Sequence, residues 1–403
     1  MQSTATPIDP ATSCVPCTIP LTSMRAAFAT LPDPRRRQGT RYPLAAVLTL
    51  SVAAILSNHL TLLAIAEWGA AQSQTLKHAL GFTRGRTPHV TTLQRLFRRL
   101  DPHALAGALT VYVDPNLPGE LRPRGSQGVA LDGKAQRGRL AFTDHSPFPM
   151  HAVSACAHDV GIVLAQLVVD THAREGELTL APLAIAQLDW QGRVLTGDAL
   201  YCQRRLSAHV VEAGGDYLLA VDANQPTLLA DIQQLFAPPP PVRAGHGTLT
   251  IEERQARQVS KGHGRVEVRE IRVSSELAEY LDWPYLQQVF EVRRTWIRKG
   301  VTKQEVHYGI TSLPQTVASP EQVLRLKRGH WGIENRLHYV KDVTLREDAS
   351  TIHCGTGPDI MAMLRTAAVS ALRRAGHHRI AARLRHNSRC PDAILALLGL
   401  SPR

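Results

Sequence analysis

Two short apolar runs that each end at an aspartate constrain the fold of this chain more than any other feature. Residues 129–131 read Val-Ala-Leu and lead to Asp132, and residues 193–196 read Arg-Val-Leu-Thr and lead, after one glycine, to Asp198. Short apolar runs of this kind are typical of buried strands. In open α/β sheets, ligands bind at the carboxyl ends of the strands, so both acids are candidate ligands, although aspartate also commonly terminates strands.

The segments around these runs follow a regular order. Strand-like segments cover 151–159 and 161–170, close enough for a hairpin, and helical patterns cover 175–188 and 202–215 before a last strand at 216–222. Three antiparallel strands followed by strand–helix–strand units predict a mixed α/β sheet with helices on its faces.

Composition shifts divide the rest of the chain. A four-proline run at 238–241 marks a loop, and the residues after it read as strands, with one period-2 strand expected within 257–275. The expected regions are a disordered tail (1–21), a helical N-terminal domain (22–120), a first core part (121–225), a β-rich insertion (226–315), a second core part (316–375) and a helical C-terminal tail (376–403).

The charge balance favours a polyanionic partner. The chain has 403 residues and a formal net charge of +12, with a pI near 9.8, which suits nucleic acid or an anionic membrane surface. Six cysteines are scattered, and no secretory signal is visible, as in a reducing cytoplasm. The pair Cys14 and Cys17 has the spacing of half a zinc site, but no second half lies nearby.

Residues 44–66 are uncharged and long enough to span a bilayer. A polar cluster, Ser57-Asn58-His59, interrupts this stretch in the middle. We therefore expect two short buried helices joined by a turn, and no membrane association.

Two basic islands lie in the N-terminal region. One is a turn containing Arg35, Arg36 and Arg37. The other is a helix with an apolar stripe, expected to be capped by Thr91 or Thr92, from which Arg95, Arg98 and Arg99 project. Such arginines suit phosphate contacts, and a solvated helix face explains them equally well.

The stretch 328–343 (RGHWGIENRLHYVKDV) is unusually rich in rings, amides and charges. At 100° per residue, an α-helix here places the side chains of His330, His338 and Lys341 within about 40° of Glu334. An apolar stripe of Ile333, Leu337 and Val340 lies on another face and can pack against the sheet. Glu334 can then join Asp132 and Asp198, while a plain surface helix remains the alternative.

Several blocks resemble DDE-type insertion-sequence transposases, in the branch of the H-repeat-associated proteins (ISAs-type). In order along the chain they are PDPRRRQGTRYPL, AIAEWG, LDGKAQRG, LTGDALYCQ, DYLLAVDANQ, HGRVEVR and RGHWGIENRLHYVKDVTLREDAS. The resemblance covers about residues 24–375. It implies a ribonuclease H-like core, interrupted by the insertion and preceded by an associated helical domain.

By position, the resemblance assigns the three metal-binding catalytic acids to Asp132, Asp198 and Glu334. It implies two Mg²⁺ ions, with Mn²⁺ as a substitute, because carboxylates and phosphate oxygens are the ligands that Mg²⁺ prefers. The phosphate or DNA contacts expected beside these acids are Lys134, His330, Asn335, His338 and Lys341. Glu347 and Asp348 are rival acids that we interpret as structural. In VDANQ, Asp222 stands where the family usually has lysine.

The implied activity is cleavage of element ends and their joining to target DNA by metal-assisted phosphoryl transfer. The implied partner is double-stranded DNA, held by a homodimer, in the cytoplasm. Two alternatives remain open: a decayed or recruited relative that only binds DNA, and a metal-dependent nuclease that does not join strands. The end sequence, the target preference and the mobility of this copy do not follow from the sequence.

Overall fold

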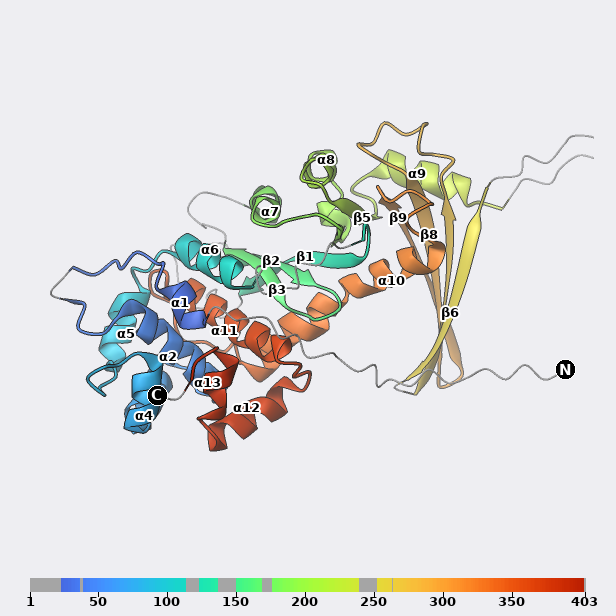
Figure 1. Ribbon diagram of the computed structural model, residues 1–403. Helices are drawn as coiled ribbons and strands as arrows, with labels where there is room; N and C mark the ends of the chain where they lie inside the picture. Colours follow the sequence, from blue (N-terminus) through green and yellow to red (C-terminus); the bar gives the residue numbers. More distant parts are fainter. Residues whose placement is uncertain are drawn as a thin grey trace, which may run out of the picture.

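The strands form one nine-stranded mixed sheet. The computed structural model describes residues 23–36, 39–113, 123–136, 150–168, 176–238, 252–262 and 264–401. The order of the strands is β3-β2-β1-β4-β5-β9-β8-β7-β6 (Figure 1). Their bounds are β1 Gln127–Gln136, β2 Met150–Ala157, β3 Val163–Val168, β4 Arg193–Gly197, β5 Asp216–Val221, β6 Arg254–Gly262, β7 Arg265–Ser274, β8 Gln288–Arg298 and β9 Val301–Thr311.

The first five strands have the ribonuclease H-like arrangement that the sequence predicts. β1 pairs antiparallel with β2, and β2 with β3. β4 then pairs parallel with β1, and β5 with β4. Every residue of β3 and β4 is buried, as expected for strands that are covered on both faces.

The insertion continues this sheet. β9 pairs antiparallel with β5, so β6–β9 extend the core edge. The period-2 strand expected within 257–275 is confirmed as β7. β6, which was not expected as a separate strand, forms a hairpin with it, and Gly264 adopts a φ of +70° that permits the turn.

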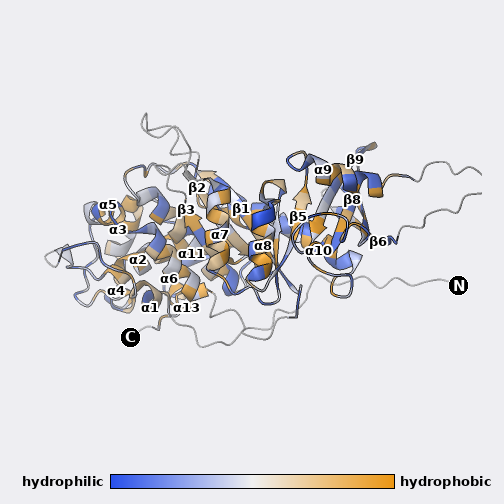
Figure 2. Ribbon diagram, turned by 90° about the horizontal axis from the view of Figure 1, so that it is seen from above, coloured by the Kyte–Doolittle hydropathy of each residue, from blue (hydrophilic) through white to orange (hydrophobic). Residues whose placement is uncertain are grey.

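Helices cover both faces of the core strands. α7 (Glu177–Ala186) and α8 (Arg204–Glu212) lie on one face (Figure 1), and from above they lie over the strands (Figure 2). α10 (Pro320–His330) and α11 (Gly357–Arg374) lie on the other face, and α9 (Pro226–Leu235) packs on β8 and β9. α11 is buried along almost its whole length between the sheet and the helical domain.

The helical domain is built from both ends of the chain. Its N-terminal helices are α1 (Met24–Phe28), α2 (Leu44–Leu56), α3 (Leu62–Ala71), α4 (Gln74–Leu80), α5 (Val90–Phe97) and α6 (Pro102–Val113). The C-terminal helices α12 (Ile380–Arg389) and α13 (Ala393–Leu397) pack against α2. Asn387 Nδ2 donates a 3.0 Å hydrogen bond to the carbonyl of Leu56. α12 and α13 therefore pack together with the N-terminal helices.

The uncharged stretch 44–66 forms two helices, as the sequence predicts. α2 ends at Leu56 and α3 begins at Leu62, and Asn58 between them adopts a φ of +65°. Among the described residues, no helix is long and apolar enough to cross a membrane. The expected tail, 1–21, lies outside the described residues, as do Cys14 and Cys17.

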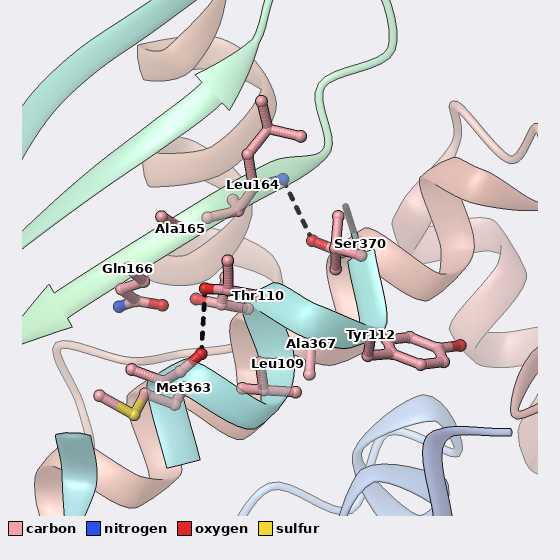
Figure 3. Close-up of a pocket in the computed structure, with 13 residues that line it drawn as sticks. Leu109, Thr110, Tyr112, Leu164, Ala165, Gln166, Met363, Ala367 and Ser370 are labelled. Carbon is pink, nitrogen blue, oxygen red and sulfur yellow. Dashed lines mark hydrogen bonds between the residues drawn. The ribbon is translucent and has the colours of Figure 1, made fainter. Parts of the chain in front are cut away.

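A small cavity lies between α6, β3 and α11 (Figure 3). Its volume is about 20 Å³, enough for about one water molecule. The buried side-chain amide of Gln166 faces it and has no hydrogen-bond partner within the described part of the chain. The cavity is too small for a substrate.

Candidate active site

The register of two parallel strands brings Asp132 and Asp198 to the same level. Ala130 of β1 is paired with Thr196 of β4, and each aspartate follows two residues later. Asp198 Oδ1 accepts a 3.0 Å hydrogen bond from the backbone N–H of Leu200, which caps the short 3₁₀ turn η4 (Ala199–Tyr201). Asp198 therefore follows the carboxyl end of β4, and Asp132 lies within β1, just beyond the point where the pairing of β1 with β4 ends.

Glu334 reaches the same place from the segment after α10. His338 Nδ1 lies 3.5 Å from Asp132 Oδ2 and 3.9 Å from Glu334 Oε2. One ligand atom from each of these three residues lies within 4.8 Å of the others. Glu334 is 57% exposed and His338 is buried, so the cluster is open on the Glu334 side.

Burial and the neighbouring carboxylates together raise the pKa of Asp132. Burial raises the pKa of Asp132 to about 7, and repulsion from Glu334 and then from Asp198 adds to the shift. Carboxylates brought together in this way are stabilised by a cation. Several carboxylate oxygens with one side open to solvent are a donor set that suits Mg²⁺, which keeps waters and substrate phosphate oxygens as further ligands. The residues present therefore fit a divalent metal.

A fourth carboxylate, which sequence reasoning missed, is Glu177 at the first position of α7. Its Oε2 accepts a 3.2 Å hydrogen bond from the hydroxyl of Tyr201, and its charge also raises the pKa of Asp132. The block LTGDALYCQ contains both Asp198 and Tyr201. No local pattern around Glu177 marks it, because only the tertiary structure brings α7 over β1.

The segment 328–343 is not one α-helix, and this corrects the predicted working face. α10 ends at His330, and two wide-turned segments follow: η5 (Glu334–His338) and η6 (Val340–Thr344). Each π-type turn holds one residue more than an α-turn and so changes the phase of later side chains. The apolar stripe is buried as predicted: Ile333, Leu337 and Val340.

Lys341 is rotated away from Glu334 as a result. It is 1% exposed, and its Nζ lies 3.1 Å from Glu347 Oε1. Lys134 is also buried, with Nζ 2.6 Å from Asp342 and 3.5 Å from Asp348. Both ammonium groups are held by carboxylates within the protein, so the structure does not support the predicted phosphate contacts for these two lysines.

The rival acids have structural partners. Glu347 is 3% exposed and lies beside Lys341 and Arg365, and Asp348 pairs with Lys134. Their positions favour Glu334 as the third acid of the cluster. Asn335, by contrast, is exposed next to Glu334, where a contact with DNA remains a prediction.

His330 belongs to a buried chain of polar groups. Its Nδ1 lies 3.2 Å from Thr196 Oγ1, which is 2.8 Å from His158 Nε2. Burial, and then the charge of Lys327, lowers the pKa of His330 to about 4. The ring is therefore neutral at pH 7, and a phosphate contact would lack the charge of an arginine. Gly329 is needed here, because a Cβ would lie 2.1 Å from the His158 ring.

The VDANQ segment holds the turn that contains Asp198. Asn224 Nδ2 donates a 2.6 Å hydrogen bond to the carbonyl of Ala199, and Gln225 Nε2 donates one of 2.9 Å to that of Cys202. Asp222 is exposed, and its carboxylate accepts a hydrogen bond from the N–H of Ala223. The side-chain amides of Asn224 and Gln225 therefore have a structural role in this turn. The carboxylate of Asp222, in contrast, adds negative charge to an edge that is already acidic.

The N-terminal arginines lie elsewhere. Arg95, Arg98 and Arg99 are exposed at α5, in the helical domain at the opposite end of the molecule from the insertion (Figure 1). The N-cap of α5 is His89, whose ring accepts from the N–H of Thr91, so the expected threonine cap is wrong. The helix begins at Val90, so the acceptor comes from His89, two residues before Thr91.

The first basic island is partly engaged within the protein. Arg35 forms a two-pronged contact with Asp33 and donates to the carbonyl of Tyr42. Arg36 is exposed, and Arg37 lies outside the described residues. DNA contacts by these arginines remain predictions.

The structure thus combines a ribonuclease H-like mixed sheet with acids side by side on its neighbouring strands β1 and β4. The chain belongs to the family described as "Transposase DDE domain", whose model matches residues 123–370. Residues 25–113 match the model "DDE_Tnp_1-associated". The resemblance found in the sequence is thereby confirmed.

Relatives include proteins of the predicted branch. The chain is 27% identical over 356 residues to "Putative transposase YncI" of Escherichia coli O157:H7, covering 86% of each. It is 26% identical to "H repeat-associated putative transposase YhhI" of Escherichia coli K12, covering 85% of this chain and 88% of the relative. A protein from Xanthobacter autotrophicus, "Uncharacterized protein in dhlA 3'region", is 30% identical over 71% of this chain and 92% of its own length.

Among solved structures, the piggyBac transposase synaptic complex with hairpin DNA has a TM-score of 0.41 and 9% identity, covering 93% of this chain and 78% of that one. That likeness is too low to support an argument about fold or function.

Proposed function

We propose that this protein is a DNA transposase that cleaves the ends of an insertion sequence and joins them to target DNA. The observation that carries this proposal is the closeness of Asp132 to two further acids, in a chain of the DDE transposase family. Ligand atoms of Asp132, Glu334 and His338 lie within 4.8 Å of one another, and the charges of Glu334 and Asp198 both raise the pKa of Asp132. Each acid comes from a different segment of the chain.

In this proposal Asp132, Asp198 and Glu334 hold two divalent ions, Mg²⁺ or Mn²⁺. When bound, such ions generate a nucleophile from water or a 3′-hydroxyl and stabilise charge on the leaving oxygen. Asp132 must be ionised to bind a cation. Its raised pKa opposes ionisation, and a nearby cation favours it. The H-bonded turn at Asp198 fixes that carboxylate relative to β1, and buried His338 limits the freedom of Asp132 and Glu334.

The partner in this proposal is double-stranded DNA, both element ends and target, and a homodimer would hold two ends together. The net charge of +12 supports a polyanionic partner. DNA in a bacterial cytoplasm is the setting that the bacterial relatives suggest.

The test is an in vitro reaction with the inverted repeats that flank the gene, in Mg²⁺ or Mn²⁺. We expect nicking at the repeat end and joined products, both abolished by Asp198→Ala and by the isosteric Asp198→Asn. Glu212→Gln, an exposed acid on α8, is the matched control and should leave both reactions unchanged.

Two outcomes contradict the proposal. Salt-sensitive binding with no cleavage in either metal selects the binding protein that has lost catalysis. Cleavage without joined products selects the nuclease. Thermal unfolding of each variant shows whether it is folded.

A further inference from the structure

A large basic groove lies between α10 and one face of the insertion. Its volume is about 1230 Å³. Eight lysines and arginines line it, against three glutamates (Glu267, Glu305 and Glu321). The cations are Arg257, Lys261, Arg265, Arg269, Arg294, Arg325, Lys327 and Arg328. None of them belongs to the acidic cluster or to the N-terminal basic islands.

Like charges are placed directly opposite each other across the strands of this groove. Arg269 of β7 faces Arg294 of β8 in the register, an arrangement that destabilises a sheet. Glu267, 4% exposed, contacts Arg269 and Arg294, and also lies 3.3 Å from Arg265. Glu267 thus contacts three guanidinium groups, and Arg294 also lies 3.3 Å from Glu305. Eight lysines and arginines against three glutamates still leave an excess of positive charge in the groove.

The helix α10 adds another cation to this crowding. Arg328 of α10 donates to Gln258 of β6. Burial lowers the pKa of Arg269, and repulsion from Arg328 lowers it further. A set of cations held together at a cost to stability indicates an anionic ligand that relieves the repulsion.

The groove leads to the acidic cluster. Its lining includes His330, Trp331 and Asn335, and Asn335 follows Glu334 directly. Trp331 is 62% exposed, which is unusual for an indole in a folded protein. A cationic groove that ends at an exposed aromatic ring is the combination used by proteins that bind single-stranded nucleic acid.

We propose that this groove binds an unpaired DNA strand, with its phosphates along the arginines and lysines and a base stacked on Trp331, so that the strand enters the acidic cluster. This inference rests on the proposed function and specifies the form of its substrate. A base within a duplex is stacked between its neighbours, and its face is not available to an indole. The chemistry of the groove therefore favours a single strand over a duplex.

The experiment measures binding of the full-length protein to a short fluorescein-labelled oligothymidine and to a labelled duplex, by anisotropy in EDTA over a salt series. We expect Trp331→Ala to weaken oligothymidine binding about 5- to 100-fold and Trp331→Phe to retain most of it. Tyr339→Ala is the matched control, because Tyr339 is also exposed, at 59%, and does not line the groove.

A second set of variants, with its own control, tests the lysines and arginines of the groove. Arg328→Ala and Lys261→Ala should each reduce the slope of log affinity against log salt by roughly 0.7. Arg293→Ala should leave it unchanged, because Arg293 neighbours Arg294 on β8 and faces the other side of the sheet. The proposal would be overturned if the Trp331→Ala and Arg328→Ala variants both bound oligothymidine as tightly as the wild type does. It would also be overturned if the wild type bound the duplex more tightly than oligothymidine and these variants weakened the binding of both to the same extent.

Binding in EDTA separates this inference from the proposed function. Groove-dependent strand binding without cleavage of repeat ends in metal would leave the groove assigned and reject the transposase. Conversely, if the groove variants bind the strand as the wild type does, and cleavage and joining also proceed normally, the groove is rejected and the transposase proposal stands.

Discussion

The carboxylate of Glu177 lies against the α-carbon of Gly133, where a Cβ would come within 2.0 Å of the carboxyl carbon. Gly133 directly follows Asp132, and Tyr201, which donates to Glu177, lies in the turn that Asp198 caps. Only glycine at 133 leaves room for this contact. The closeness of Glu177 to two of the predicted metal ligands indicates a role in the same site.

We predict that Glu177→Gln lowers the rate of metal-dependent cleavage about 10- to 100-fold and raises the Mg²⁺ concentration needed for half-maximal rate. Gly133→Ala should act in the same direction because it displaces the carboxylate, and Tyr201→Phe should have a smaller effect. Cleavage rates across a Mg²⁺ titration test this, with Glu212→Gln as the control. A Glu177→Gln protein with the wild-type rate and Mg²⁺ dependence would show that the carboxylate is only structural.

Lys341 tests the correction made to the helix face. Lys341→Ala leaves Glu347 buried without its nearest ammonium partner, and breaking a buried pair in this way costs about 3–5 kcal/mol. We therefore expect a lower free energy of unfolding in urea. Lys303→Ala, at an exposed lysine, should change stability little. Unchanged stability with weakened DNA binding would instead restore the phosphate contact predicted from the sequence.

The core was predictable because its signals are local. Apolar runs such as 129–131 bury on both faces, so the mixed sheet and the neighbouring positions of Asp132 and Asp198 followed from the sequence. The end of β1 did not, because the strand continues past Asp132 to Gln136. The same holds for the polar break at Asn58, which separates α2 from α3. In each case a few adjacent residues determine the structure.

The remaining parts depend on contacts between distant segments. An ideal helical period assumes 3.6 residues per turn, and nothing in 334–344 signals the wider turns that bury Lys341. Glu177 joins the site only because α7 packs over β1, and the groove exists only because the insertion strands align with β5. Such placements follow from tertiary packing rather than from spacing along the chain.

Asp222 offers a gain-of-function prediction. It is exposed at the end of β5, where the family usually has a lysine, and it adds to the negative charge near Asp198. Asp222→Lys should tighten duplex DNA binding at low salt and steepen the salt slope by about 0.9 if one phosphate is contacted. Glu279→Lys makes the same change in charge at another exposed position. Equal tightening in both variants, measured by anisotropy, would reduce the effect to net charge alone.

His158 makes stability depend on pH. Burial, followed by the charges of His330, Arg325 and Arg336, lowers its pKa to about 3. Below its unfolded pKa of about 6.5, the unfolded chain takes up a proton that the folded protein refuses, so stability present above that pH is lost on acidification. Between pH 7.5 and 5.0 this residue should account for a loss of about 2 kcal/mol. Urea unfolding at both pH values tests this: His158→Gln should lose that much less than the wild type, whereas the exposed-site control His353→Gln should lose as much as the wild type does. An equal loss in the His158→Gln protein would mean that other groups carry the pH dependence.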